Sequence, residues 1–112
     1  MRSAVRHGMT LECWASRSFA FQMANVGSEV DRTFRARERG NDARFASAKE
    51  RCLALLFHTL EANLDSPADA RRALRAMERY LDLVDRPDPR GEAALIRYFD
   101  CWGLAYAREA WL

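Results

Sequence analysis

The sequence predicts an all-α fold, an antiparallel four-helix bundle with a long first helix. Apolar residues recur every three or four positions along four stretches, which is the spacing of one helix face. The 5 glycines and 3 prolines gather at a few places, whereas a β-sandwich needs a turn about every ten residues. Hydrophobic residues make up 49% and charged residues 30% of the 112 positions, a globular balance that allows a core without disulfides or metal. We therefore expect a flexible leader over residues 1–9 and a single helical-bundle domain over residues 10–112.

The first helix is predicted to run without interruption from an N-cap at Thr10 to the residues before Gly40. Arginines at positions 35, 37 and 39 crowd its last turn, where cations complement the helix dipole. Gly40 then supplies the left-handed residue that follows many helices. Gly27 lies beside a row of small residues, which favours close packing of another helix. The expected core positions are Leu11, Ala15, Phe19, Met23, Val26, Val30 and Phe34.

Three shorter helices follow, and a cap or breaker marks each boundary. Asn41 or Asp42 caps the second helix, and Ser66 caps the third, with Pro67 at the tolerated first position. The prolines within residues 85–91 separate the third helix from a fourth that begins at about Glu92. Helices joined by such short loops pack as antiparallel neighbours. The expected core positions are Phe45, Ala48, Cys52, Leu53, Leu55, Leu56, Leu60 and Leu64, then Ala70, Leu74, Met77, Leu81 and Val84, then Leu95, Phe99, Trp102, Tyr106 and Ala110.

Two aromatic residues of the first helix, Trp14 and Phe21, lie off its core stripe. The helix is longer than its partners, so its N-terminal third projects or packs on another part of the molecule. Exposed aromatic side chains would indicate a dimer contact. A contact with the C-terminal Trp111 and Leu112 explains them equally well, and both interpretations stay open.

Arginine is the dominant basic residue, because Lys49 is the only lysine. The formal net charge is only +2. Arginine suits phosphate recognition, although a GC-rich genome gives the same bias. Three stripes at helical spacing could form a nucleic-acid surface. Glu78 and Asp82 lie three or four residues from Arg75 and Arg79, as in surface ion pairs, and no aromatic residue alternates with these arginines to stack bases. We therefore favour solvated, salt-bridged faces for the stripes, which are Arg32/Arg35/Arg39, Arg44/Arg51 and Arg72/Arg75/Arg79.

A polar stripe on the first helix provides four of the candidate binding residues. Asn25, Ser28, Glu29 and Arg32 stand at i, i+3, i+4 and i+7, so their side chains share one face. The stripe borders the core and is either a buried hydrogen-bond network that fixes helix register or the wall of a ligand cleft. We favour the structural interpretation.

Arg51 is the fifth candidate binding residue, because Arg51 and His58 have the R-x6-H spacing. This spacing resembles the active sites of HEPN-type ribonucleases, which are also small helical bundles. The pattern departs at Cys52, where those enzymes usually have a polar residue. Helical geometry places His58 near the edge of the exposed face, and we favour a structural histidine.

No catalytic residue, metal site or cofactor is predicted. No Glu-x-x-His pair of the kind used by di-iron bundles occurs. The scattered Cys13, Cys52 and Cys101 are interpreted as reduced thiols that act as small buried hydrophobes. No apolar run approaches the roughly 20 residues of a membrane span, and the N-terminus has no apolar signal region. We expect a cytoplasmic protein without membrane contact.

Four segments carry a resemblance to a known family over about residues 20–108. They are similar to a family of short, uncharacterised bacterial helical proteins with the patterns NIGSEVxR, KEKGN, RALELL and KYFDxFxxxAR. The resemblance implies a helical fold and no particular activity. The matching segments are residues 25–30 (NVGSEV) with Arg32, residues 37–41 (RERGN), residues 51–56 (RCLALL), and residues 98–100 (YFD) with 105–108 (AYAR).

The chain departs from the family pattern at two positions. Ala36 stands where the family has an aromatic residue, and His58 stands where it has an aliphatic one, which weakens the ribonuclease hypothesis. The resemblance also makes Met9 an alternative to Met1 as the start of translation.

Three functional hypotheses follow from the sequence. The first is a non-enzymatic interaction module that forms a homo-oligomer or docks a protein partner, with Trp14 or Phe21 at the contact. The alternative is an RNA- or nucleotide-binding bundle, including a degenerate HEPN-like ribonuclease. The third is a small-ligand site at Glu29 and Arg32.

Overall fold

The computed structural model describes residues 11–111, and this part of the chain is helical without strands. The expectations for the leader, the cap at Thr10, the Leu11 side chain, Leu112 and the start of translation lie outside what it describes. The all-α class is confirmed. The helices are α1 (Leu11–Ala15), α2 (Phe19–Glu38), α3 (Asp42–Ala62), α4 (Pro67–Asp85) and α5 (Pro89–Trp111).

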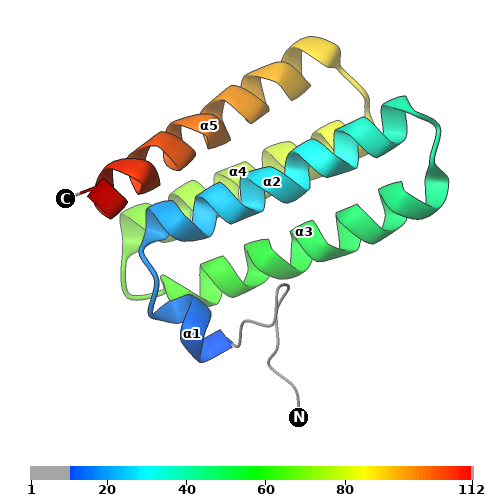
Figure 1. Ribbon diagram of the computed structural model, residues 1–112. Helices are drawn as coiled ribbons and strands as arrows, with labels where there is room; N and C mark the ends of the chain where they lie inside the picture. Colours follow the sequence, from blue (N-terminus) through cyan, green and yellow to red (C-terminus); the bar gives the residue numbers. More distant parts are fainter. Residues whose placement is uncertain (1–10, 112) are drawn as a thin grey trace.

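The four longer helices lie side by side, and successive helices run in opposite directions (Figure 1). Helix α2 lies between α5 and α3, with α4 behind it, and the short α1 lies at the end of α3. Among residues 11–111, no helix combines the length and the apolar character needed to cross a membrane.

The prediction of one uninterrupted first helix is wrong, because the chain breaks between α1 and α2. The Ser18 side chain accepts a hydrogen bond from the backbone N–H of Phe21 and caps α2. The Gln22 amide donates to the carbonyl oxygens of Trp14 and Arg17, at 2.8 and 3.2 Å. These bonds satisfy polar groups that two new helix ends would otherwise leave unpaired. The apolar period continues across the break, so periodicity alone could not reveal it.

The expected exposure of Trp14 is also wrong. Trp14 is 2% exposed and donates from Nε1 to the Thr59 hydroxyl at 3.1 Å, so it fastens α1 to α3. Phe21 is half-buried, with its ring 5.2 Å from that of Tyr106. Trp111 is 89% exposed and does not cover either ring. Trp14 is therefore not available as a dimer contact, whereas the half-buried Phe21 keeps part of its surface accessible.

The turn between α2 and α3 forms as the sequence predicted. Gly40 has a positive φ of 69°. The N–H of Gly40 donates to Arg37 O, and the N–H of Asn41 donates to Ala36 O, which is the Schellman pattern. The Asn41 side chain then caps α3 by accepting from the N–H of Arg44 at 3.0 Å. This tight reversal brings the end of α2 beside the start of α3.

The core contains most of the predicted positions of α2, α3 and α5, but the stripe predicted for α4 is displaced. Leu74 and Leu81 are each 42% exposed, and Tyr80 is fully buried. The Tyr80 hydroxyl can be buried because it shares a 2.8 Å hydrogen bond with Thr33 on α2. Leu64 and Ala110 are also exposed, contrary to the prediction. The buried residues of α4 are Ala73, Ala76, Met77, Tyr80 and Leu83.

Candidate functional site

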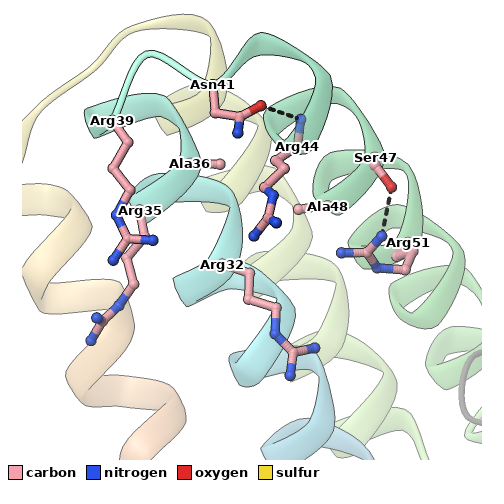
Figure 2. A pocket seen from close by; sticks show the side chains of 9 residues that line it. All are labelled: Arg32, Arg35, Ala36, Arg39, Asn41, Arg44, Ser47, Ala48 and Arg51. Atoms are coloured by element: carbon pink, nitrogen blue, oxygen red, sulfur yellow. Dashed lines mark hydrogen bonds between the residues drawn. The ribbon is translucent and has the colours of Figure 1, made fainter.

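Five arginines from α2 and α3 line one cavity of about 610 Å³, here called the arginine groove. Figure 2 shows Arg44 between Ala36 and Ala48, whereas Arg35 and Arg39 extend on the opposite side of Ala36 from α3. Ala36 and Ala48 are almost fully buried, so their small side chains form a floor that leaves the groove open. The arginines are Arg32 and Arg35 from α2, Arg39 at its C-cap, and Arg44 and Arg51 from α3.

The local sequence explains why these side chains converge. Arg32, Arg35 and Arg39 follow i, i+3, i+7 spacing, and Arg44 and Arg51 stand two turns apart, so each set shares one side of its helix. The Schellman turn at Gly40 folds α3 back along α2. Two stripes that are separate in the sequence thereby become the two walls of one groove.

A buried carboxylate supports the groove from behind. Glu29 is 1% exposed and accepts from Nη1 of Arg32 at 2.9 Å and from Nε of Arg51 at 3.2 Å. Arg51 also donates from Nη1 to the Ser47 hydroxyl at 2.6 Å. Hydrogen bonds to a buried carboxylate restrict the rotamers of both arginines. Glu29 is therefore a positioning residue for Arg32 and Arg51.

The groove carries an excess of positive charge. Arg35 pairs with Asp31 at 2.8 Å on the surface of α2. Arg39 and Arg44 have no carboxylate within 4.0 Å in the described part of the chain. Glu29 and Asp31 are thus the only carboxylates paired with these arginines there. Two guanidinium groups remain that can bind an external anion without breaking an ion pair.

The structure separates the five predicted site residues. Glu29, Arg32 and Arg51 form one hydrogen-bonded cluster, which brings part of the polar stripe together with the residue taken from the R-x6-H pattern. Asn25 and Ser28 instead donate to carbonyl oxygens of their own helix, at 2.9 and 3.5 Å. Sequence reasoning treated Arg39 and Arg44 only as members of surface stripes. The feature of the sequence that could have identified them is the Gly40-Asn41 turn, because it folds the two arginine stripes to face each other.

The structure does not bring Arg51 and His58 together. Arg51 bonds to Glu29 and Ser47. The Nδ1 atom of His58 is buried without a hydrogen-bond partner in the described chain, and it lies 3.6 Å from a Glu61 carboxylate oxygen. The two side chains therefore have different partners in the described part of the chain.

A second cavity, of about 500 Å³, lies between α4 and α5 and is here called the arginine–aromatic groove. Arg72 pairs with Asp69 at 2.7 Å. The ion pairs expected for Arg75 and Arg79 do not form, because neither has a carboxylate within 4.0 Å among the described residues. The functional side chains that line this groove are Arg72, Arg75, Arg79, Tyr98 and Trp102.

The thiols differ in environment, contrary to the prediction that all three are buried. Cys52 is fully buried, whereas Cys13 and Cys101 are exposed. Desolvation raises the pKa of Cys52 to about 12, and the nearby Glu29 charge acts in the same direction, against a hydrogen bond with Tyr80. Burial likewise raises the pKa of Tyr80. In residues 11–111, no group of three or more His, Cys, Asp or Glu side chains is placed to hold a metal ion.

Comparison with protein-family models, with curated proteins and with solved structures finds no match to this chain.

Proposed function

We propose that the protein is an RNA-binding helical bundle that contacts the phosphate backbone through the arginine groove. The presence of five arginines among the residues that line one cavity supports this proposal most strongly. Guanidinium groups bind phosphate oxygens through paired N–H donors. Arg39 and Arg44 make the direct contacts, and Glu29 holds Arg32 and Arg51 in place beside them.

The length of the groove favours a polyanion over a single phosphate. Seven residues separate Arg32 from Arg39, and seven separate Arg44 from Arg51, so each wall extends roughly 10 Å along its helix. Neighbouring phosphates along an unpaired strand lie roughly twice as far apart as the 3.4 Å rise per strand along a duplex axis. Two or three consecutive phosphates therefore fit along the groove, which explains why the arginines are spread out.

The scaffold in this proposal is an antiparallel four-helix bundle of α2 to α5, with α1 as a short addition. The sites lie in the seams between neighbouring helices, where bundles commonly build ligand sites. We expect such a protein to act in the cytoplasm, where RNA is available.

Fluorescence anisotropy with a labelled single-stranded RNA oligonucleotide tests the proposal. Three phosphate contacts predict that Kd rises roughly 20-fold between about 50 and 200 mM salt. Arg39→Gln/Arg44→Gln should raise Kd at low salt at least about tenfold and lower the salt slope by about 1.4.

The matched control is Arg86→Gln/Arg90→Gln, which removes the same charge from exposed positions outside the groove. We expect the control to keep the salt slope of the unmodified protein. Equal losses in the two double variants would show that only net charge matters, and absence of binding at low salt would overturn the proposal. A DNA oligonucleotide of the same sequence tests whether the backbone sugar contributes.

Self-association is the second candidate function, and exposed apolar side chains favour it. Phe57 on α3 and Leu64 in the turn after it are 56% and 74% exposed, and Leu74 and Leu81 on α4 are each 42% exposed. Leu74 and Leu81 stand seven residues apart on one side of α4, and exposed apolar side chains that gather on a surface indicate an interaction site. Light scattering at micromolar concentration should detect a dimer that Phe57→Ser dissociates. A monomer at all concentrations would exclude this candidate.

A further inference from the structure

The arginine–aromatic groove combines two chemistries that the arginine groove does not. Its lining includes cationic side chains from α4 and aromatic side chains from α5, and no helix contributes to both grooves. Ala76 and Ala94 also line it, and their short side chains keep the space between the two walls open. The groove therefore presents guanidinium groups and aromatic rings to the same space.

The two rings are held in place by edge contacts. Tyr98 and Trp102 stand one turn apart on α5, with ring centroids 6.3 Å apart and planes at 81°. Trp102 also meets Phe19 at 5.0 Å and 87°, and Tyr98 meets Phe99 at 5.4 Å and 72°. None of these contacts is a parallel stack. Both residues are half-buried, so the rings are fixed and yet reachable from the groove.

The cationic wall is available to an anion. Arg75 and Arg79 lack a carboxylate partner among the described residues, and Arg72 is 50% exposed in its pair with Asp69. Guanidinium groups that have no acidic partner are suited to binding phosphate. A flat ring joined to a phosphate matches both walls, and this is the chemistry of a nucleotide.

We propose that the arginine–aromatic groove is a second binding subsite that stacks a nucleobase against Tyr98 or Trp102 while Arg75 and Arg79 hold its phosphate. The inference rests on the proposed RNA-binding function and deepens it, because the protein would then bind unpaired bases as well as phosphates. Stacking on an aromatic side chain tolerates every base, since every base has a π face. The bound RNA is therefore single-stranded at this subsite.

Two oligonucleotide probes separate stacking from charge. One is a single-stranded RNA, and the other has the same backbone with abasic positions. Tyr98→Leu should weaken binding of the RNA roughly tenfold and leave binding of the abasic probe unchanged. Arg75→Gln/Arg79→Gln should weaken binding of both probes and lower the salt slope by about 0.7, for the one phosphate that the two arginines hold. Circular dichroism and the thermal midpoint verify that each variant is folded, and Tyr98→Phe, which keeps the ring, should restore RNA binding.

Tryptophan fluorescence gives an independent measurement. In a Trp111→Phe protein, the remaining tryptophans are the buried Trp14 and the groove residue Trp102. Base stacking should quench the Trp102 emission, and an abasic probe should not. Quenching by a mononucleotide as well as by the oligonucleotide would show that one nucleotide unit is enough, and quenching by the oligonucleotide alone would show that the strand is required.

The two proposals fail in different ways. If RNA binds through Arg39 and Arg44 but neither the RNA oligonucleotide nor a mononucleotide quenches Trp102, the second subsite does not exist. Equal weakening of RNA and abasic binding by Tyr98→Leu would also overturn it. If Trp102 is quenched while Arg39→Gln/Arg44→Gln binds normally, the arginine groove is the part that fails.

Discussion

The two grooves are built on the same sequence element, a stripe of arginines at helical spacing, and yet they differ in what faces the stripe. In the arginine groove, the α2 stripe faces a second stripe on α3, and none of the lining residues is aromatic. In the arginine–aromatic groove, the α4 stripe faces Tyr98 and Trp102 on α5. The comparison shows that the chemistry of an arginine stripe is set by the neighbouring helix.

The grooves also differ in how their arginines are supported. Glu29 lies behind the arginine groove and binds two of its guanidinium groups. Beside the arginine–aromatic groove, Asp69 at the start of α4 pairs with the exposed guanidinium group of Arg72. One groove should therefore depend on a buried charge, and the other should depend on aromatic packing.

The largest predicted effect is on stability when the buried carboxylate is removed. Glu29→Ala should lower the free energy of unfolding by about 3 kcal/mol, near the lower end for breaking a buried ion pair, because the released arginines can reach solvent. It should also weaken phosphate binding in the arginine groove. Urea denaturation with anisotropy measures both effects.

Asp31→Ala is the matched control, because Asp31 lies two residues away on the same helix in an exposed pair with Arg35. Exposed pairs contribute about 0–1 kcal/mol, so the control should change stability little. Similar losses in the two variants would contradict the role assigned to Glu29. Trp102 quenching should survive in both proteins.

Sequence periodicity predicted the all-α class, the Gly40 turn and most of the core because each depends on local residue types. The stripe of α4 was misplaced because Tyr80 looks half-polar in the sequence, and only its hydrogen bond to Thr33 makes its burial favourable. The break before α2 was missed because its polar groups are satisfied by Gln22, which also fits a continuous helix.

The candidate sites depended on contacts between helices, which one-dimensional spacing does not contain. Glu29 and Arg32 were singled out because they share a face, but Arg39 and Arg44 face each other only after the turn folds back. The spacing made ion pairs of Arg75 and Arg79 plausible. In the fold, both arginines instead line a cavity together with aromatic residues of another helix.

The next effect, on binding, comes from filling each groove without changing its charge. Ala36→Phe places a large ring on the floor of the arginine groove, so RNA and abasic binding should both fall roughly tenfold as phosphates lose access. Ala94→Phe fills the arginine–aromatic groove and should remove Trp102 quenching entirely, with weaker RNA binding as the stacking contact is lost, whereas Ala36→Phe should leave quenching by saturating RNA in place. If each variant affected both readouts equally, the grooves would not be separate sites. Thermal midpoints of the two variants verify folding.

A smaller predicted effect is a loss of stability at alkaline pH, caused by the buried thiol of Cys52. Burial raises the pKa of Cys52 above the unfolded value of 9.0, to about 12. Above pH 9 the unfolded thiol ionises while the folded thiol keeps its proton, so stability falls as pH rises from 9 toward 12. For one group the slope approaches about 1.4 kcal/mol per pH unit once the unfolded thiol is ionised. Thermal melts between pH 8 and 10 should show this loss.

Cys101, which is exposed on α5, provides the comparison for Cys52. Cys52→Ala should flatten the alkaline slope, and Cys101→Ser should leave it unchanged. Alkylation at pH 8 followed by mass spectrometry should modify Cys101 well before Cys52. An equal rate at the two sites would show that Cys52 is reachable from solvent.

The smallest effect concerns the seam that joins the two grooves, since α2 carries one arginine wall and α5 carries the aromatic wall. A Cβ at Gly27 would lie 2.6 Å from the Phe99 Cβ, and neither atom can move without its helix. Overpacking costs about 1–3 kcal/mol, and replacing a helical glycine returns about 1 kcal/mol, so Gly27→Ala should destabilise by about 1 kcal/mol. Gly103→Ala is the control on α5, because its Cβ meets no heavy atom within 4 Å, and it should stabilise the fold slightly.

The same pair of variants shows whether the aromatic wall depends on how closely α5 lies against α2. Moving α5 outward in Gly27→Ala should alter Trp102 quenching, because the arginines of α4 stay in place while the rings shift. Phosphate binding by the arginine groove should be unchanged, since α5 contributes no residue to it. If Gly27→Ala weakened abasic binding instead, the two grooves would be mechanically coupled through α2, and the independence argued from their separate helices would be wrong.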